Sequence, residues 1–406
     1  MKARNLYIRT WKELSADKEM VFLSGPRQVG KTTLAKMIAA DFRNSLYWNW
    51  DIAADKTRLF ENPVFFEDIE RRDNSTPLII LDEIHKYHDW KNYLKGLYDG
   101  YHEKYCFLVT GSGRLDIYQK GGDSLAGRYL PFHLWPFTIA ELAEANRPVE
   151  DFLSNPLDLT MERNSELKAL WSQIEAASGF PEPFLSSRIP AYRRWSQTYA
   201  VRLIREDIRD LTDIKSVANM ETLYILLPSR VGSPLSLTSL AETLHVSYNT
   251  IRSWLDIFER FFLVFSISPW TEKVARAIQK EKKCYLWDVP RVTDQAARFE
   301  NMVAIELWRA VTCWNDKGLG RFSLHFVRNK EKEEVDFLIA DENRPLFLIE
   351  AKSSDTRPSR ALMKFQRMLG IPAIQLTREG DAFRTLSNGD LPILVAPACQ
   401  WLSGLP

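Results

Sequence analysis

A phosphate-binding loop limits most strongly what this chain can fold into. Residues 25–32 read Gly-Pro-Arg-Gln-Val-Gly-Lys-Thr, a complete G-x-x-x-x-G-K-T motif. An apolar run, residues 20–23, precedes the motif, and an amphipathic helical pattern begins at Thr32. A loop in this setting points backbone N–H groups toward an anion, and the helix that follows adds its positive end. The sequence therefore predicts a strand, a triphosphate-binding loop and a helix, since a plain glycine turn needs no Lys-Thr pair in this register.

Roles follow for individual residues of this loop. Lys31 is expected to contact the β- and γ-phosphates of ATP, and Thr32 to hold Mg²⁺ through its hydroxyl group. The loop residues expected to bind the nucleotide are Gly25, Pro26, Arg27, Gln28, Val29, Gly30, Lys31, Thr32 and Thr33.

A second apolar run ends in two acids. Residues 78–83 read Leu-Ile-Ile-Leu-Asp-Glu, which is typical of a Walker B strand. Asp82 is expected to bind the Mg²⁺ of the nucleotide, and Glu83 to polarise the attacking water. Acids are common at strand ends, but this run follows a complete phosphate loop, which favours the catalytic interpretation.

Two further polar features near these runs each allow two interpretations. Residues 110–113 read Thr-Gly-Ser-Gly, and Ser112 is expected to contact the γ-phosphate between the two Walker strands. An ordinary helix N-cap is the equal alternative for this segment. His85 and His88 lie three residues apart, and we interpret them as a solvated helix face rather than as a metal pair.

The order of apolar runs predicts the fold class. Four short runs, residues 20–23, 46–50, 78–81 and 105–110, alternate with helical patterns. Strands separated by helices predict a parallel sheet with helices on both faces, which here means an α/β P-loop NTPase fold. With 406 residues, 45 % of them hydrophobic and 26 % charged, the chain is expected to form about two to four globular domains.

Composition argues against several classes of protein. No apolar run approaches the roughly 18 residues of a membrane span, and residues 1–10 lack a secretory pattern, so we expect no membrane contact and a cytoplasmic location. The four cysteines lack C-x-x-C spacing and are expected to be buried thiols. Because the net charge is only +1, a nucleic-acid surface has to be a local patch.

Changes of pattern divide the remainder of the chain. Residues 137–209 read mostly as helix, and residues 237–268 have the outline of a winged helix-turn-helix. Mixed α/β character returns after residue 273, with a hairpin expected from residues 334–340 and 346–351. We expect four domains: an ATPase domain at residues 1–145, a helical linker at 146–215, a winged helix-turn-helix at 216–272 and a small α/β domain at 273–406.

Several of these segments resemble one known family. The segments are residues 25–33, the acids of Leu81-Asp82-Glu83, Thr110-Gly111-Ser112, and Ser124-Leu125-Ala126-Gly127-Arg128-Tyr129. They resemble the AAA-type ATPase module of bacterial and archaeal proteins that also carry a C-terminal DUF4143 domain, and the resemblance covers nearly the whole chain. Residues 179–182 and 205–211 fit the linker of that family, which usually has a glycine where this chain has Ser178.

The resemblance implies a role for Arg128 as an arginine finger. A guanidinium supplied to a neighbouring subunit neutralises charge on the transferred phosphoryl group, which implies a homo-oligomeric ring or partial ring. The alternative is a structural salt bridge beside Asp123. Arg205 or Arg209 would instead sense the nucleotide within its own subunit.

The second helix of the expected helix-turn-helix carries residue types that contact DNA. These are Asn249, Thr250, Arg252 and Ser253. A basic run follows, with Lys273, Arg276, Lys280, Lys282 and Lys283. The helix either contacts DNA or packs domains together, and the basic run is either a solvated face or a surface for the DNA backbone.

Carboxylates on the expected C-terminal hairpin form a second candidate site. Asp336 lies in one strand, and Glu350 and Lys352 share a face of the next, so pairing brings them together. With Glu300 on the helix expected from residue 294 to 310, they resemble the PD-(D/E)xK nuclease superfamily. That resemblance implies that Asp336, Glu350 and Glu300 hold Mg²⁺, while Lys352 orients water or stabilises charge on the phosphate. An ordinary ion pair between Glu350 and Lys352 is the alternative.

These features predict an ATPase that uses ATP and Mg²⁺ and couples hydrolysis to DNA binding or remodelling. Cleavage of DNA by the nuclease-like domain is left open, because such domains are also retained for binding alone. A different class of function remains open as well, namely a nucleotide-dependent switch that acts on a protein partner. Salt-dependent DNA binding would favour the first, and a co-purifying protein with little DNA affinity the second.

Overall fold

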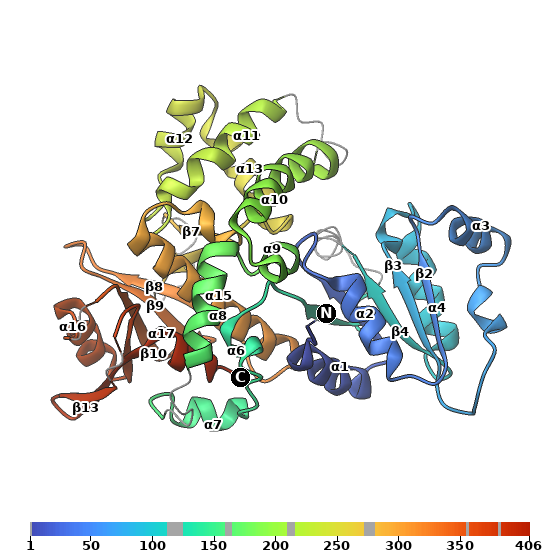
Figure 1. Ribbon diagram of the computed structural model, residues 1–406, viewed down its shortest axis with the longest axis horizontal. Helices are drawn as coiled ribbons and strands as arrows, with labels where there is room; N and C mark the ends of the chain where they lie inside the picture. The colour runs from blue at the N-terminus through green and yellow to red at the C-terminus, as the bar shows by residue number, and fades with distance from the viewer. Residues whose placement is uncertain are drawn as a thin grey trace. The chain divides into compact units, whose positions relative to one another are not determined.

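The computed structural model describes residues 2–111, 125–158, 165–208, 216–271, 281–354, 357–380 and 383–406. It divides the chain into two compact units (Figure 1). Unit 1 comprises Met1–Trp135 with Arg260–Phe262, and unit 2 comprises Pro136–Glu259 with Leu263–Pro406. The four expected domain boundaries remain a prediction.

Unit 1 is built on a sheet of five parallel strands. In the order of the sheet these are β2 (Ser45–Asn49), β3 (Leu78–Asp82), β4 (Cys106–Thr110), β1 (Met20–Ser24) and β5 (Leu130–His133). Every residue of β1, β3 and β4 is buried, as their continuous apolar sequences predict. The four apolar runs identified in the sequence form the edge strand β2 and the three central strands β3, β4 and β1.

Helices cover both faces of this sheet. The helices are α1 (Asn5–Asp17), α2 (Lys31–Ala40), α3 (Ala53–Glu61) and α4 (Trp90–Tyr101), with short 3₁₀ turns at Phe65–Asp68 and Ile84–Lys86. Alternate residues of β1 point to opposite sides: Val21 and Leu23 pack with α1 and α2, and Met20 and Phe22 pack with α3 and α4. The α/β fold expected from the sequence is confirmed.

The fifth strand, β5, was not among the four apolar runs identified in the sequence. Pro131 lies within β5 and aligns with Phe22 of β1. Proline cannot donate a ladder hydrogen bond, so it is tolerated in β5 only because this is an edge strand that pairs on one side.

Unit 2 begins with helices. They are α6 (Ile139–Leu142), α7 (Val149–Ser154), α8 (Ser165–Ala177), α9 (Pro181–Ser186), α10 (Ile189–Arg202) with a π-helical end at Leu203–Ile208, α11 (Val217–Leu226) with a 3₁₀ end at Leu227–Arg230, α12 (Leu237–Leu244) and α13 (Tyr248–Arg260). Helices α12 and α13 form the helix pair expected from the sequence, and the antiparallel strands β6 (Val264–Pro269) and β7 (Lys283–Leu286) follow as its wing; β7 lies beyond the expected boundary at residue 272.

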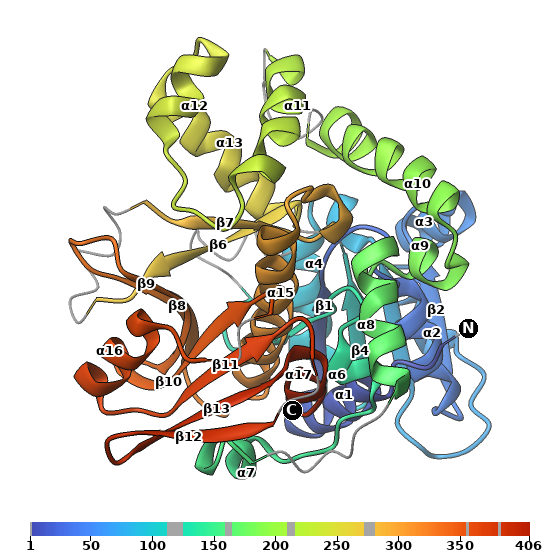
Figure 2. The same cartoon turned by 60° about the vertical axis from the view of Figure 1, so that its left-hand side comes forward.

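A mixed eight-stranded sheet completes unit 2 (Figure 2). Its further strands are β8 (Phe322–Arg328), β9 (Glu334–Asp341), β10 (Arg344–Lys352), β11 (Ala373–Thr377), β12 (Arg384–Asn388) and β13 (Leu391–Pro397), and the order is β12-β13-β11-β10-β9-β8-β6-β7. Helices α15 (Gln295–Asp316), α16 (Arg360–Leu369) and α17 (Ala398–Ser403) pack on it. The β9–β10 hairpin is the one expected from the sequence, and the two strands of the wing continue the same sheet through β6 and β8.

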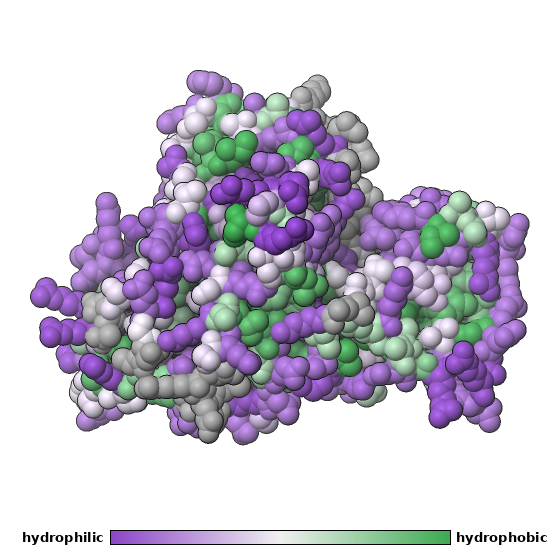
Figure 3. All heavy atoms as spheres, viewed as in Figure 1, coloured by the Kyte–Doolittle hydropathy of each residue, from purple (hydrophilic) through white to green (hydrophobic). Residues whose placement is uncertain are grey.

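The surface seen in Figure 3 is largely hydrophilic. Among the described residues, the large hydrophobic residues with more than half of their surface exposed are Phe60, Leu185, Ile225 and Met368. Among the described residues, no helix is both long and apolar enough to cross a membrane. The four cysteines are all buried, as the sequence predicts.

Candidate functional site

The phosphate loop follows β1 and leads into α2. Gly25 has φ +146°, and a Cβ atom there would lie 2.1 Å from the carbonyl oxygen of Leu134, so only glycine fits this close approach. Gly30 has φ +99° and caps the N-terminus of α2. The two glycines of the motif thus set the backbone path that exposes successive N–H groups at the helix start.

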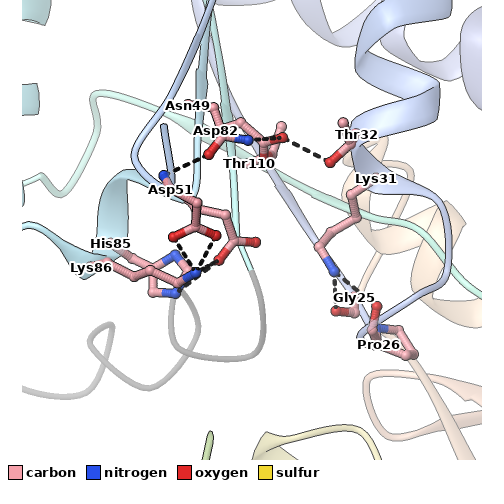
Figure 4. A network of polar contacts seen from close by, with 11 residues as sticks. Gly25, Pro26, Lys31, Thr32, Asn49, Asp51, Asp82, His85, Lys86 and Thr110 are labelled. Carbon is pink, nitrogen blue, oxygen red and sulfur yellow. Dashed lines mark hydrogen bonds and ion pairs between the residues drawn. The ribbon is translucent and has the colours of Figure 1, made fainter. Parts of the chain in front are cut away.

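Lys31 lies at the first position of α2 and reaches back over the loop. Its Nζ donates hydrogen bonds to the carbonyl oxygens of Gly25, at 3.0 Å, and Pro26, at 2.8 Å (Figure 4). The side chain is almost fully buried, so its ammonium group is already held where the loop turns. Val29 is buried, Arg27 and Thr33 are half-buried, and Gln28 is exposed with φ 61°.

Asp82 and Thr32 meet at the ends of β3 and α2. The Thr32 hydroxyl donates to Asp82 Oδ2 at 2.7 Å, across 50 residues of sequence. Asp82 is buried at the end of its strand. A hydroxyl and a carboxylate oxygen are ligands that suit Mg²⁺, so the pair fits the ion expected there.

Side chains that the sequence analysis did not select also bind Asp82; besides Asn49, whose Nδ2 donates to Oδ2 at 3.4 Å, two hydroxyl groups do so. The Tyr47 hydroxyl of β2 donates to Oδ2 at 2.7 Å, and the Thr110 hydroxyl of β4 donates to Oδ1. Burial, followed by the hydrogen bond to Asp82, raises the pKa of Tyr47, so it stays a donor. The order of the strands would have identified Tyr47 and Thr110. Strand β3 lies between β2 and β4, so residues of these two neighbouring strands lie beside Asp82.

Glu83 follows Asp82 in a left-handed conformation, with φ 59°. Its Oε2 lies 3.2 Å from Lys86 Nζ and 3.7 Å from His85 Nε2. Lys86 also binds Asp51 at 2.7 Å, as Figure 4 shows. Burial lowers the pKa of Lys86, but the two carboxylates outweigh it and raise the pKa overall. His85 is buried, which corrects the expectation of a solvated face, whereas His88 is exposed.

The other residues predicted for the nucleotide site do not join this cluster. Ser112 and Arg209 lie outside the residues that the structure describes. Arg128 forms an exposed, bidentate ion pair with Asp99 of α4, at 2.7 and 3.1 Å, in its own subunit. Arg205 pairs with Glu221. Their assigned roles stay predictions.

The carboxylates of the C-terminal hairpin come together as expected. Asp336 Oδ2 accepts a hydrogen bond from the backbone N–H of Ala351 at 2.9 Å, and Lys352 pairs with Glu350 at 2.7 Å. Glu300 of α15 joins this group through Lys283, whose Nζ lies 2.9 Å from Glu300 and 3.6 Å from Asp336. Burial, and then repulsion from Asp336, raise the pKa of both Glu300 and Glu350.

Lys283 corrects one sequence expectation. The sequence placed it in a solvated or DNA-binding basic run, but its side chain has 0 % exposure and is surrounded by carboxylates. Lys282 is exposed, and Lys273, Arg276 and Lys280 lie outside the described residues. In the described ranges, no group of three or more His, Cys, Asp or Glu side chains is arranged to hold a metal ion. Metal binding by Glu300, Asp336 and Glu350 stays a prediction, and as arranged these residues hold an ammonium group.

The second helix of the helix-turn-helix, α13, has two distinct faces. Ile251, Trp254 and Phe258 are buried on one side. On the other side, Asn249, Arg252 and Ser253 are exposed, and Thr250 is half-buried beside Ser247. The residues selected from the sequence therefore lie on the solvent side of the helix.

Comparison with known proteins supports the domains expected in the N-terminal and C-terminal parts of the chain. A family model described as an AAA domain matches residues 17–143, and one described as a domain of unknown function, DUF4143, matches residues 296–392. A third, described as a domain of unknown function, DUF8612, matches residues 169–290. These matches confirm the family resemblance read from the motifs.

Related chains come from bacteria and archaea. An uncharacterized protein of Mycobacterium tuberculosis is 22 % identical over 391 residues, which cover 95 % of this chain and 81 % of the relative. One of Methanocaldococcus jannaschii is 21 % identical over 346 residues, covering 80 % and 75 %. A Walker-type ATPase of Pyrococcus abyssi matches 72 % of this chain and 95 % of its own at 14 % identity with a TM-score of 0.44, which is too low to bear on function. The chain thus carries an AAA-type P-loop ATPase domain at residues 17–143 and a DUF4143 domain at residues 296–392.

Proposed function

We propose that this ATPase couples Mg²⁺-dependent ATP hydrolysis to the binding or remodelling of DNA. The observation that carries the DNA part is the solvent-facing side of α13, where Asn249, Arg252 and Ser253 stand exposed on the second helix of a helix-turn-helix. Amide, guanidinium and hydroxyl groups are the donors that contact phosphates and base edges. Their exposure leaves these three side chains accessible to a DNA ligand.

At the nucleotide site, each side chain has a separate task. Lys31 would exchange its two loop carbonyls for the β- and γ-phosphate oxygens, which are stronger acceptors because they are charged. Thr32 and Asp82 would hold Mg²⁺, which supplies charge neutralisation between the phosphates. Glu83 would accept a proton from the attacking water, and Lys86 and His85 hold the Glu83 carboxylate in one orientation until then.

The proposal also includes assembly of the chain into a homo-oligomer, and it leaves DNA cleavage open. Arg128 would complete the nucleotide site of a neighbouring subunit in a homo-oligomeric ring or partial ring. The paired strands β9 and β10 support a nuclease-like fold, while cleavage of DNA is left as a question for experiment.

The test is DNA binding and ATP turnover measured with single-stranded, duplex and branched DNA at several salt concentrations. Binding should weaken linearly in log–log form as salt rises, and Arg252→Ala should reduce that slope by about one phosphate contact. Arg321→Ala, which removes an exposed arginine from another surface of unit 2, is the matched control and should leave the slope unchanged.

A specific outcome would favour the alternative function. If no DNA binds at low salt while a protein co-purifies and leaves on ATP addition, the chain is a nucleotide-dependent switch for a protein partner. ATP hydrolysis would then remain, and the DNA part of the proposal would fail.

A further inference from the structure

One lysine occupies the middle of the carboxylate group of unit 2. Lys283 Nζ lies 2.7 Å from Glu334 Oε1, 2.9 Å from Glu300 Oε1 and 3.6 Å from Asp336 Oδ1. An ammonium group has three donors, and these three oxygens come from α15 and β9. The side chain of Lys283 is fully buried, whereas the carboxylates keep between 13 and 20 % of their surface exposed. The ammonium therefore lies beneath the acids rather than at the mouth of the site.

The backbone fixes Lys283 in this place. It is the first residue of β7, where it pairs with Ile267 of β6, and it forms an isolated antiparallel bridge to Pro234 on its other side. Tyr285, two residues further along the same strand, donates its hydroxyl hydrogen bond to Glu300 at 2.8 Å. Two alternate residues of one strand thus bind the same carboxylate, as the period of a β-strand allows.

The charges of the site nearly cancel without any added ion. Four carboxylates, those of Glu300, Glu334, Asp336 and Glu350, are matched by three cations. These are Lys283, Lys352 on Glu350 and Arg328 on Glu334. Buried carboxylates are costly unless they are paired, and here the chain supplies most of the partners, although Glu350 Oε2 is buried without a hydrogen-bond partner.

We propose that the Lys283 ammonium is the resident cation of this carboxylate group, and that it takes the place that a nuclease-like fold would give to a divalent metal ion. A divalent ion needs oxygen ligands at about 2.0 to 2.6 Å around one point. In this site Lys283 Nζ lies between two of the three expected ligands, since it binds Glu300 and lies near Asp336. A metal ion bound by these acids would have to displace the buried Lys283 ammonium group. The C-terminal domain thus holds its acids together without metal and does not cleave DNA by a metal-dependent route.

The test is a titration of the nucleotide-free full-length chain with Mn²⁺, in which electron paramagnetic resonance measures the concentration of the free ion. Wild type and Asp336→Asn should give the same binding curve, because no site depends on Asp336. Lys283→Met should gain a site that binds Mn²⁺ roughly tenfold or more tightly than wild type, and adding Asp336→Asn should remove it again. Lys352→Met is the matched control: it removes an ammonium from the same group but leaves Lys283 in place, and it should gain no site.

Two results would overturn the proposal: Asp336-dependent Mn²⁺ binding by wild type, or a folded Lys283→Met chain that gains no site. Because Lys283→Met removes the cation nearest to three carboxylates, it is also made with Glu334→Gln, which removes one of those charges. The comparison of wild type with Asp336→Asn decides even if neither variant folds. ATP hydrolysis is not part of this readout, so the outcome is separate from that of the proposed DNA function.

Discussion

Asp82 shows how single residues prepare the nucleotide site. Its buried carboxylate accepts hydrogen bonds from the hydroxyl groups of Thr32, Tyr47 and Thr110, which come from three different elements. Each donor satisfies a lone pair that would otherwise be buried without a partner, and together they fix the orientation of the carboxylate. These contacts orient the carboxylate that is expected to hold Mg²⁺.

Replacing Lys31 should impair nucleotide binding, whereas replacing Glu83 should impair ATP turnover. Lys31→Ala removes the β/γ-phosphate contact and should weaken nucleotide binding by roughly tenfold or more, the loss of a charged hydrogen bond. Glu83→Gln should keep binding but slow turnover by roughly a hundredfold, because it acts on the water rather than on the bound phosphates. Titration with a fluorescent ATP analogue and steady-state turnover separate the two effects. Equal turnover in wild type and Glu83→Gln would remove Glu83 from its role.

Tyr47→Phe tests whether the second donor to Asp82 matters. The variant deletes one hydroxyl group and leaves the ring in place, so the Mg²⁺ concentration for half-maximal ATP hydrolysis should rise roughly tenfold. Tyr93→Phe is the matched control, because the Tyr93 hydroxyl binds the carbonyl oxygen of Pro63 and not Asp82. A Mg²⁺ dependence that stays the same in Tyr47→Phe would make Tyr47 a merely structural neighbour.

At the scale of elements, α15 and α6 are joined by one buried carboxyl group. Glu306 Oε1 of α15 accepts the backbone N–H of Ile139 at 2.6 Å and so binds the N-terminus of α6. Burial is the main cause that raises the pKa of Glu306, from 4.5 to about 8; the N–H groups of α6 and Arg309 oppose the rise, and Glu141 adds to it. The folded chain therefore keeps a proton that the unfolded chain has already lost.

That difference predicts how stability changes with pH. Between pH 4.5 and about 8 the folded state binds more protons at Glu306 than the unfolded state, so the free energy of unfolding falls as pH rises through this window. Glu306→Gln keeps an acceptor for Ile139 but removes the titration. Its Tm relative to wild type should therefore increase from pH 5 to pH 8.5, by at least about 3 °C. Glu103→Gln, at an exposed position, should show no such trend, and a flat difference for Glu306→Gln would contradict the prediction.

The elements themselves were largely predictable from sequence, but some of their contacts were not. Strands β1 to β4 are continuous apolar runs, and the β9–β10 hairpin has turn residues between two such runs, so local pattern was sufficient. Strand β5 was missed because Pro131 argues against a strand unless its edge position is known. Lys283 was misplaced because its neighbours in sequence are basic, and only the sheet order shows that this residue turns inward.

Partners that lie far apart in sequence explain the remaining omissions. Tyr47 and Thr110 lie 35 and 28 residues from Asp82. Residues 110–113 were selected from the sequence for Ser112, but no local pattern identifies Thr110 or Tyr47 as a partner of Asp82. The phosphate loop and the Walker B acids could be identified because their spacing is short and fixed by the phosphate itself. Residues that act through another residue carry no such spacing, so they emerge only when the order of strands is known.

At the scale of the whole molecule, the open question is whether one chain contains a complete nucleotide site. Arg128 pairs with Asp99 of its own subunit, but both side chains are partly exposed and such pairs stabilise little. The guanidinium can therefore exchange Asp99 for a phosphate at low cost. If it does so across a subunit boundary, hydrolysis requires assembly.

Mixing two inactive variants tests this directly. Arg128→Ala lacks the guanidinium but keeps Glu83, and Glu83→Gln has the reverse defect. If Arg128 acts in trans, an Arg128→Ala site beside a Glu83→Gln neighbour has every part, so an equal mixture should recover about a quarter of the wild-type interfaces. If it acts in cis, no site in the mixture has both groups. Differently tagged chains show by co-purification that mixed assemblies form, and Asp99→Asn, which frees Arg128 without removing it, should remain active alone. Mixed assemblies that stay as inactive as either variant would assign Arg128 to its own subunit.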